Sequence, residues 1–364
     1  MNKDYKKYIV LWLSQSVSGL GSSMTGYALV LLTGRLSVWN IYVVNAVVGI
    51  TNAFQQPAAA VATGKLVPKD KISNVSGMNS FSQNLIVIFS PMLAAAFYAA
   101  GGLRVILMVD LATFDLAFCV LLFVITIPEQ PERAAYTSPF SGAVEGLRFL
   151  KQERGLLYIM LTMALINFFS RLTYENILSP MILARSGDSS IILGIVNACM
   201  GIGGIVGGVI VSVKKESGRK TIGIYGSAAL SFLFGDLLMA VGRNVFWWSA
   251  AAVAASMPIP FIMANQNAIL YRRIPEELQG MVFAVRNAIQ YSTIPVGILL
   301  GGYLADYVFE PFLRSGTGVA VLLQHVVGNS AGSGMAAMFL CTGILGFSVS
   351  FLSCFNRQIR KLDA

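Results

Sequence analysis

Residues 191–213 read IILGIVNACMGIGGIVGGVIVSV, a run of 23 residues without one charged side chain. A helix rises 1.5 Å per residue, so a helix of this length extends about 35 Å. That length exceeds the hydrocarbon core of a bilayer, which is about 30 Å thick. The run therefore predicts a membrane-spanning helix.

Ten stretches of the chain are long and apolar enough to form such a helix. The first follows three lysines, as in a signal peptide, but its apolar run is too long for a cleaved segment and no A-x-A site follows it. We therefore expect a retained helix. The predicted fold class is an all-α polytopic membrane protein with spans at 8–33, 38–62, 72–98, 103–127, 156–183, 190–213, 221–242, 245–271, 281–305 and 335–355.

The composition supports this class and excludes others. Of the 364 residues, 55% are hydrophobic and 12% are charged, about half the charged fraction of a soluble domain. This excludes a soluble enzyme, a disordered protein and, despite the net charge of +9, a nucleic-acid-binding domain. The four cysteines occur singly and there is one histidine, His325. We therefore expect no disulfide framework, no metal site, no hydrolase triad and no cofactor.

The distribution of basic residues predicts the orientation. With the N-terminus in the cytoplasm, 19 Lys and Arg residues fall on the cytoplasmic side of the spans and 5 on the outer side. This asymmetry follows the positive-inside rule. We therefore expect a multi-pass protein of the plasma membrane with both termini cytoplasmic. The five outer residues are Arg35, Arg104, Arg185, Arg243 and Arg314.

The longest charged connection, residues 128–155, predicts the domain organisation. It separates four spans in 1–127 from six spans in 156–364, so we interpret it as a cytoplasmic linker between two helical bundles. Within it, residues 140–149 carry apolar side chains at helical spacing, which is typical of an amphipathic helix on a membrane surface. On the outer side, we expect residues 308–334 to form a loop with a short apolar patch.

The two halves share an internal repeat. The series Val67-Pro68-Lys69-Asp70, Gly77 and Pro91 corresponds to Ile274-Pro275-Glu276-Glu277, Gly280 and Pro295, at offsets near 205 residues. Two halves related by a parallel repeat are a known transporter architecture. Aligning the halves indicates that about 60 residues are missing from the first half. That length is enough for two membrane-spanning helices of about 20 residues each with their connections.

A set of motifs covers nearly the whole chain: Gln15, Ser18 and Gly21-Ser22-Ser23; 54–58 and 66–70; Asp110 with Thr113-Phe114; 194–198 with 201–203; and 332–335. With this set the chain resembles the major facilitator superfamily, in particular its macrolide-efflux-like drug exporters. Members of this family have twelve spans. The resemblance therefore implies that, between about Val30 and Leu36, this chain lacks the family's second helix, most of its third and the basic loop that joins them.

This resemblance implies secondary active export of a hydrophobic drug-like compound by alternating access of two bundles. It further implies coupling to protons and a monomer embedded in the lipid bilayer, with no nucleic acid as partner. An alternative is a truncated remnant that inserts in the membrane but does not transport. A membrane enzyme is disfavoured because no catalytic constellation is present.

Charged residues inside the spans are functional candidates, because their burial in lipid is costly. Arg171 and Glu175 lie four residues apart, on one face of a helix. They are either a proton-coupling pair or a structural ion pair between helices. Asp110 and Asp236 are proton carriers or simply hydrated, since both lie towards the outer ends of their spans. Arg286 is expected to extend to the cytoplasmic interface.

Amide side chains are dense for membrane helices. They predict a substrate-binding surface for a polar group, with hydrogen bonding between helices as the alternative. In the second half, Gly204-x-x-x-Gly208 predicts close packing of two helices. The predicted substrate-binding residues are Gln15, Asn52, Gln55, Gln56, Asn79, Gln83, Asn265, Gln266, Asn287, Gln290, Phe168 and Phe169.

Overall fold

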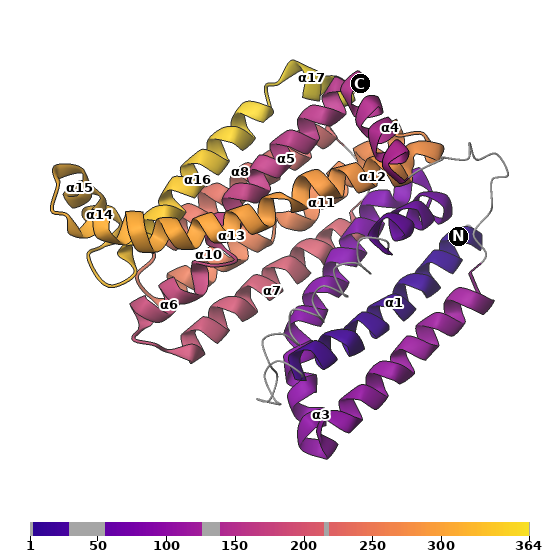
Figure 1. The fold of residues 1–364 in the computed structure, drawn as a ribbon, viewed down its shortest axis with the longest axis horizontal. Coiled ribbons are helices and arrows are strands. Elements are labelled where there is room, and N and C mark those ends of the chain that lie inside the picture. Colours follow the sequence, from indigo (N-terminus) through magenta and orange to yellow (C-terminus); the bar gives the residue numbers. More distant parts are fainter. Residues whose placement is uncertain (1–2, 29–54, 126–138, 215–217, 364) are drawn as a thin grey trace.

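A computed structural model describes residues 3–28, 55–125, 139–214 and 218–363 (Figure 1). Within these ranges all regular structure is helical, and seven helical segments are long and apolar enough to cross a membrane. The predicted all-α class is confirmed. The seven segments are Lys69–Phe123, Arg154–Ser186, Ser190–Val213, Lys220–Val241, Val245–Arg273, Glu276–Arg314 and Ser333–Ser353.

An N-terminal group of helices consists of α1 (Lys3–Tyr27), a helix over 55–66, and α3 (Ile72–Phe123), which follows the short helix η2 (Lys69–Lys71). Helix α3 folds back on itself at Gly101 and Gly102. Gly102 has φ +67°, which a residue without a Cβ adopts readily. This turn divides α3 into a first arm, residues 72–100, and a second arm, residues 103–123, with α1 packed between them (Figure 1).

A larger C-terminal group holds the helices from α5 onwards, several of which follow one another within one membrane-crossing segment. Helix α5 is separated from α6 by a turn at residues 174–177, and the π-helices η3 and η4 interrupt two other segments. Such interruptions occur often at functional sites. The helices are α5 (Arg154–Thr173), α6 (Leu178–Ser186), α7 (Ser190–Val213), α8 (Lys220–Leu230), η3 (Ser231–Asp236), α9 (Leu237–Val241), α10 (Val245–Ser256), α11 (Ile259–Arg273), α12 (Glu276–Tyr291), α13 (Thr293–Leu304), η4 (Ala305–Phe309), α14 (Glu310–Arg314), α15 (Gly318–Val327), α16 (Ser333–Ser353), α17 (Arg357–Arg360) and η5 (Lys361–Asp363).

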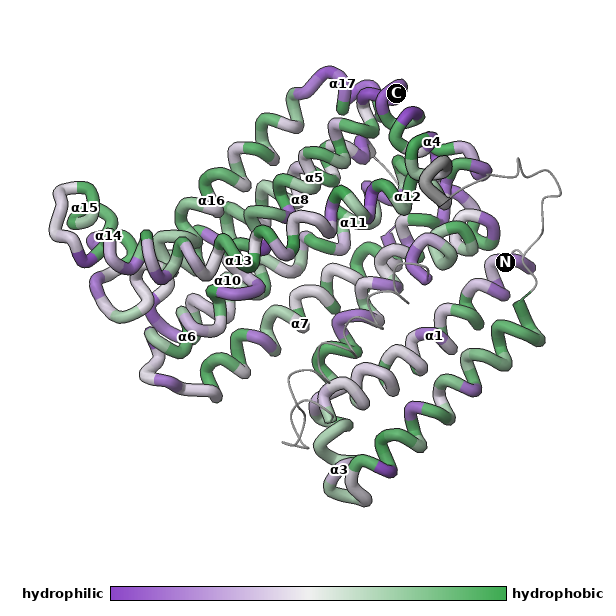
Figure 2. Tube along the Cα trace, in the orientation of Figure 1, coloured by the Kyte–Doolittle hydropathy of each residue, from purple (hydrophilic) through white to green (hydrophobic). Residues whose placement is uncertain are grey.

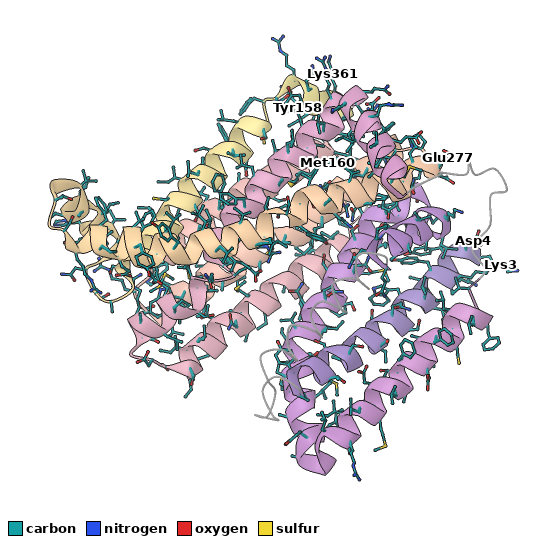
Figure 3. All side chains as sticks on the ribbon, viewed as in Figure 1. Lys3, Asp4, Tyr158, Met160, Glu277 and Lys361 are labelled. Carbon is teal, nitrogen blue, oxygen red and sulfur yellow. The ribbon has the colours of Figure 1, made fainter. Side chains whose placement is uncertain are left out.

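The surface is apolar along the lengths of the helices and polar at one end. Figure 2 shows hydrophobic residues along both arms of α3, and large side chains such as Leu111 and Phe123 are exposed. In Figure 3, Lys3, Asp4, Glu277 and Lys361 lie at the same end of the molecule, near the N- and C-termini. We refer to it as the charged end. An apolar girdle that ends in a charged surface is the arrangement expected of a protein in a lipid environment.

The two groups meet where α3 packs closely on α7. A Cβ atom on Gly208 would lie 2.8 Å from the backbone nitrogen of Phe81 and 3.0 Å from the carbonyl oxygen of Gly77. A Cβ on Gly204 would overlap the side chain of Asn84. The close packing predicted for Gly204-x-x-x-Gly208 is confirmed, because only glycine allows the two backbones to approach this far.

The prolines of the internal repeat have matching backbone conformations. Pro68 has φ −56° and ψ 142°, and Pro275 has φ −54° and ψ 144°. Each stands immediately before a helix, where the missing N–H of proline is not needed. This match supports the repeat. The deletion expected between Val30 and Leu36 lies outside the residues that the structure describes.

The expectation that residues 308–334 form a loop is wrong in one respect, because much of this segment is helical. Helix α14 precedes α15, which contains the apolar patch, and Gln324 donates a hydrogen bond from Nε2 to the carbonyl oxygen of Leu313 between them. Ala320 and Val327 are buried, so helical folding removes their side chains from solvent. The helix predicted at 140–149 is confirmed as α4 (Pro139–Gln152), and its place on the membrane surface stays a prediction.

Candidate functional site

Arg171 and Glu175 form an ion pair at the end of α5. Their side chains are 35% and 43% exposed, so the pair borders space that no described residue fills. A Cβ on Gly297 of α13 would lie 2.9 Å from the Cβ of Arg171, which shows how closely α13 fixes the base of this arginine. The pair lies on successive turns of a single helical segment. The ion pair is thus formed, and its role in proton coupling or in structure stays a prediction.

The turn at 174–177, between α5 and α6, is held by side chains on either side of Glu175. The hydroxyl of Tyr174 donates to Oδ1 of Asp236 at 3.0 Å. The Nδ2 of Asn176 donates to the carbonyl oxygen of Ile298 on α13 at 3.0 Å. These side-chain bonds anchor the turn to η3 and α13. The backbone of the turn is satisfied locally, for example by the bond from the N–H of Ile177 to the carbonyl oxygen of Thr173.

Asp236 is a buried carboxylate rather than a hydrated one. It is 1% exposed and lies at the end of the π-helix η3. Besides Tyr174, the hydroxyl of Thr342 on α16 donates to its Oδ2 at 3.0 Å. The expectation that water hydrates Asp236 is therefore wrong, because tertiary packing covers it and hydroxyl groups satisfy its oxygens.

Asp110 joins α1 to the second arm of α3. The hydroxyls of Ser22 and Thr25 on α1 donate to its two carboxylate oxygens, at 3.1 and 2.7 Å. Gly21 allows this approach, since a Cβ there would lie 3.1 Å from Oδ1 of Asp110. Hydroxyl groups of a neighbouring helix thus satisfy both carboxylate oxygens of Asp110. Its role as a proton carrier stays a prediction.

Three of the predicted substrate-binding amides come together at one cavity. The cavity has a volume of about 120 Å³ and lies between α1 and the first arm of α3. Ser82 donates to the hydroxyl of Ser16 at 2.7 Å on its wall. We call it the amide cavity. Its described lining residues are Trp12, Gln15, Ser16, Gly19, Asn79, Ser82, Gln83 and Ile86.

The other predicted binding residues are dispersed. Asn265 donates to the carbonyl oxygen of Phe261 on its own helix, and Gln266 is 6% exposed with an Nε2 that has no partner in the described part of the chain. Asn287 accepts hydrogen bonds from Arg286. Gln55 and Gln56 are exposed, Gln290 is half-buried, and Phe168 and Phe169 form a tilted aromatic pair. Asn52 lies outside the described residues.

Sequence reasoning missed a hydrogen-bonded chain between the two groups of helices. Asn267 donates from Nδ2 to the hydroxyl of Ser76 on α3 at 3.0 Å, and accepts at Oδ1 from Arg286 at 3.2 Å. The guanidinium of Arg286 also lies 4.9 Å from the ring centroid of Phe283. Arg286 is thus engaged inside the protein, and its expected extension to the interface is wrong. The amide run at 265–267 was the available signal.

The sequence matches the Major Facilitator Superfamily over residues 7–298, which is most of the chain. The chain belongs to this family. Because the members of the Major Facilitator Superfamily are transporters, the chain is assigned to transporters and not to enzymes.

Two relatives found by sequence comparison are named as efflux proteins. Macrolide efflux protein A of Streptococcus pyogenes is 26% identical over 364 residues, covering 98% of this chain and 82% of the relative. Multidrug efflux pump Tap of Mycolicibacterium fortuitum is 23% identical over 299 residues, covering 73% of this chain and 66% of the relative. The resemblance predicted from the motifs is confirmed at the level of the family.

Solved structures share the fold. The human organic anion transporter MFSD10 superposes with a TM-score of 0.61 at 14% identity, covering 94% of this chain and 82% of that chain. A bacterial homologue of the iron transporter ferroportin, in an outward-facing state, superposes with a TM-score of 0.54 at 13% identity, covering 98% and 84%. At these identities the likeness establishes the major facilitator fold alone.

Proposed function

We propose that the chain is a secondary active exporter of hydrophobic drug-like compounds, coupled to proton entry. The names of the two curated relatives support efflux as the direction and drugs as the substrates. The observation that carries the coupling is the position of the Arg171–Glu175 pair, exposed beside an interruption of a membrane-crossing segment. Discontinuous helices in transporters commonly form the substrate and ion sites.

Glu175 is the proton carrier in this proposal. A carboxylate that borders open space can exchange a proton with solvent. Asp236 and Asp110 are weaker candidates because hydroxyl donors already occupy their oxygens. Their hydrogen bonds fit a role in holding helices together, whereas Glu175 has an exposed side chain.

The proposed architecture comprises ten spans arranged as four and six. It places a reduced bundle at 1–127, a cytoplasmic linker at 128–155 and a second bundle at 156–364. The turn within α3 supports two spans in that segment. The charged end faces the cytoplasm of the cell, with the chain in the plasma membrane, and the unit that transports is a monomer.

The alternative is a remnant that inserts but does not transport. It is favoured by one observation, since the chain covers 82% of the length of Macrolide efflux protein A. The internal repeat likewise indicates that two helices are missing from the first half. Lipid-facing surface carries little hydrophobic penalty, so insertion survives such a loss more readily than switching does.

Drug accumulation in an exporter-deficient host tests the proposal. Cells that produce the chain should accumulate less of a fluorescent apolar drug than cells with an empty vector, and a protonophore should abolish the difference. Equal accumulation in both would reject export and favour the remnant. A second chain, with about 60 residues, or two spans, restored between Val30 and Leu36, then shows whether the missing segment accounts for the loss.

A further inference from the structure

The amide cavity is lined by uncharged polar groups. Among its described lining residues are three amides, two serines, one tryptophan and no ionisable side chain. Gln15, Asn79 and Gln83 are exposed, so their polar atoms reach the cavity surface. An amide offers both a carbonyl acceptor and two N–H donors. The wall can therefore hydrogen-bond a ligand group of either kind without supplying a charge.

The amides retain unused hydrogen-bonding capacity. Gln15 and Gln83 have no hydrogen-bond partner within the described part of the chain, while Asn79 is paired with Tyr8. Nearby, the Nε1 of Trp12 is buried without an acceptor among the described residues. Among the described residues, hydrogen bonding between helices, which is the alternative explanation for amides in membrane helices, therefore does not account for Gln15 and Gln83.

The volume and polarity restrict what the cavity takes. A water molecule accounts for roughly 30 Å³ of liquid, so about 120 Å³ accommodates a substituent and not a whole drug molecule. An ion is costly to transfer from water to a site without a counter-charge, and the described lining residues supply none. The lining thus favours a neutral group over an ammonium or a carboxylate.

We propose that the amide cavity is a subsite for a neutral oxygen-bearing substituent, such as a hydroxyl, ether or carbonyl group, of the exported compound. The inference rests on the proposed function, since it concerns the substrate of that export. Gln15 and Gln83 hydrogen-bond the oxygen atoms, and Trp12 and Ile86 pack against the adjoining carbon atoms. The apolar body of the compound lies outside this cavity.

Equilibrium binding to the purified full chain in nanodiscs tests the subsite. Two probes are used: erythromycin, which carries many hydroxyl and carbonyl oxygens, and tetraphenylphosphonium, an apolar cation without oxygen. Each of Gln15→Leu and Gln83→Leu should raise the Kd of erythromycin about 3- to 10-fold, the effect of losing one neutral hydrogen bond. The Kd of tetraphenylphosphonium should stay within about twofold of the wild-type value.

A pair of glycine variants on α1 provides the matched control. Gly19 lines the cavity, so Gly19→Val places a side chain in it, whereas a Cβ on Gly26 meets no atom within 4 Å. Gly19→Val should weaken erythromycin binding and Gly26→Val should not. Size-exclusion profiles confirm that each variant is folded.

The outcomes separate the subsite from the proposed function. Equal effects on both probes, or no effect of Gln83→Leu and Gly19→Val, overturn the subsite, as does a wild-type chain that binds no erythromycin. If the wild type binds erythromycin with the expected pattern but does not export it from cells, the proposed function fails and the subsite stands. If Gln15→Leu, Gln83→Leu and Gly19→Val all bind erythromycin as the wild type does and export persists, the subsite is rejected and the proposed function stands.

Discussion

Asn267 on α11 donates from Nδ2 to the hydroxyl of Ser76 on α3, at a distance of 3.0 Å. This bond connects the two groups of helices, and Arg286 orients the same amide by donating to its Oδ1. At the same interface the hydroxyl of Tyr271 donates to the carbonyl oxygen of Ala60 at 2.8 Å. The contacts between the groups near the charged end thus include specific polar bonds as well as close glycine packing.

Removing the Asn267–Ser76 bond should favour separation of the two groups of helices at the charged end. Ser76→Ala deletes the acceptor, and one neutral hydrogen bond contributes about 1 kcal/mol, or roughly fivefold in an equilibrium between two conformations. Electron-spin distance measurements between labels at Asp70 and Glu277 should show a larger population at long distances. Ser348→Ala, which removes a hydroxyl bonded only within its own helix, is the control. An unchanged distribution of label distances in Ser76→Ala would show that the bond does not hold the two groups of helices together at this end.

Neutralising Glu175 should abolish proton-driven export while leaving the amount of protein in the membrane unchanged. Glu175→Gln keeps the size of the side chain but cannot take up or release a proton. Export of a fluorescent drug from cells and immunoblots of their membranes measure the two quantities. Glu145→Gln on α4, outside the membrane-crossing segments, controls for loss of a carboxylate. Normal export by Glu175→Gln would remove Glu175 from the mechanism, and a fall in yield would indicate a structural ion pair.

Asp236 should be more important for stability than for coupling. Asp236→Leu leaves the buried hydroxyl of Tyr174 without its acceptor, at a cost of about 1–3 kcal/mol. The hydroxyl of Thr342 keeps the carbonyl oxygens of Met338 and Phe339 as acceptors. Asp236→Asn retains an acceptor oxygen and should be better tolerated. Thermal unfolding in detergent should therefore rank wild type above Asn and Asn above Leu. A Leu variant as stable as wild type would contradict this ranking.

Two glycines on α7 should respond oppositely to the same substitution. Gly208→Ala places a Cβ 2.8 Å from the backbone of Phe81, so we expect destabilisation of about 1–3 kcal/mol from overpacking. A Cβ on Gly194 meets no atom within 4 Å. Gly194→Ala should therefore gain up to about 1 kcal/mol from the higher helix propensity of alanine. Unfolding of both variants in the same detergent measures the difference, and equal stabilities would refute the close contact of α3 and α7.

The proposed orientation can be tested by labelling with a membrane-impermeant thiol reagent. In a chain whose four native cysteines are replaced, a cysteine at position 322 in α15 should react in intact cells. One at position 152 in α4 should react only after the membrane is permeabilised. Both side chains are exposed, so a lack of reaction reflects the membrane and not burial. Labelling at position 152 in intact cells would reverse the assignment of sides.

The sequence by itself determined the class of fold and the family. Apolar run length, charge placement and glycine spacing are local properties, and lipid imposes the same demand on every spanning helix. The run at 191–213 therefore predicted α7, and the motifs along the chain predicted the Major Facilitator Superfamily. The close approach at Gly208 was also predicted, because small residues at this spacing pack helices closely in membranes.

The tertiary structure decided which polar residues meet. Neighbouring residues on a helix point about 100° apart, so their surroundings depend on how each helix is rotated against its neighbours. That rotation placed Gln15 and Gln83 on one cavity, turned Asp236 into the protein and directed Asn267 to Ser76. The apolar patch at 319–327 likewise lies in helix α15, where Ala320 and Val327 are buried. Sequence spacing identifies the polar side chains, but contacts between distant helices select their partners.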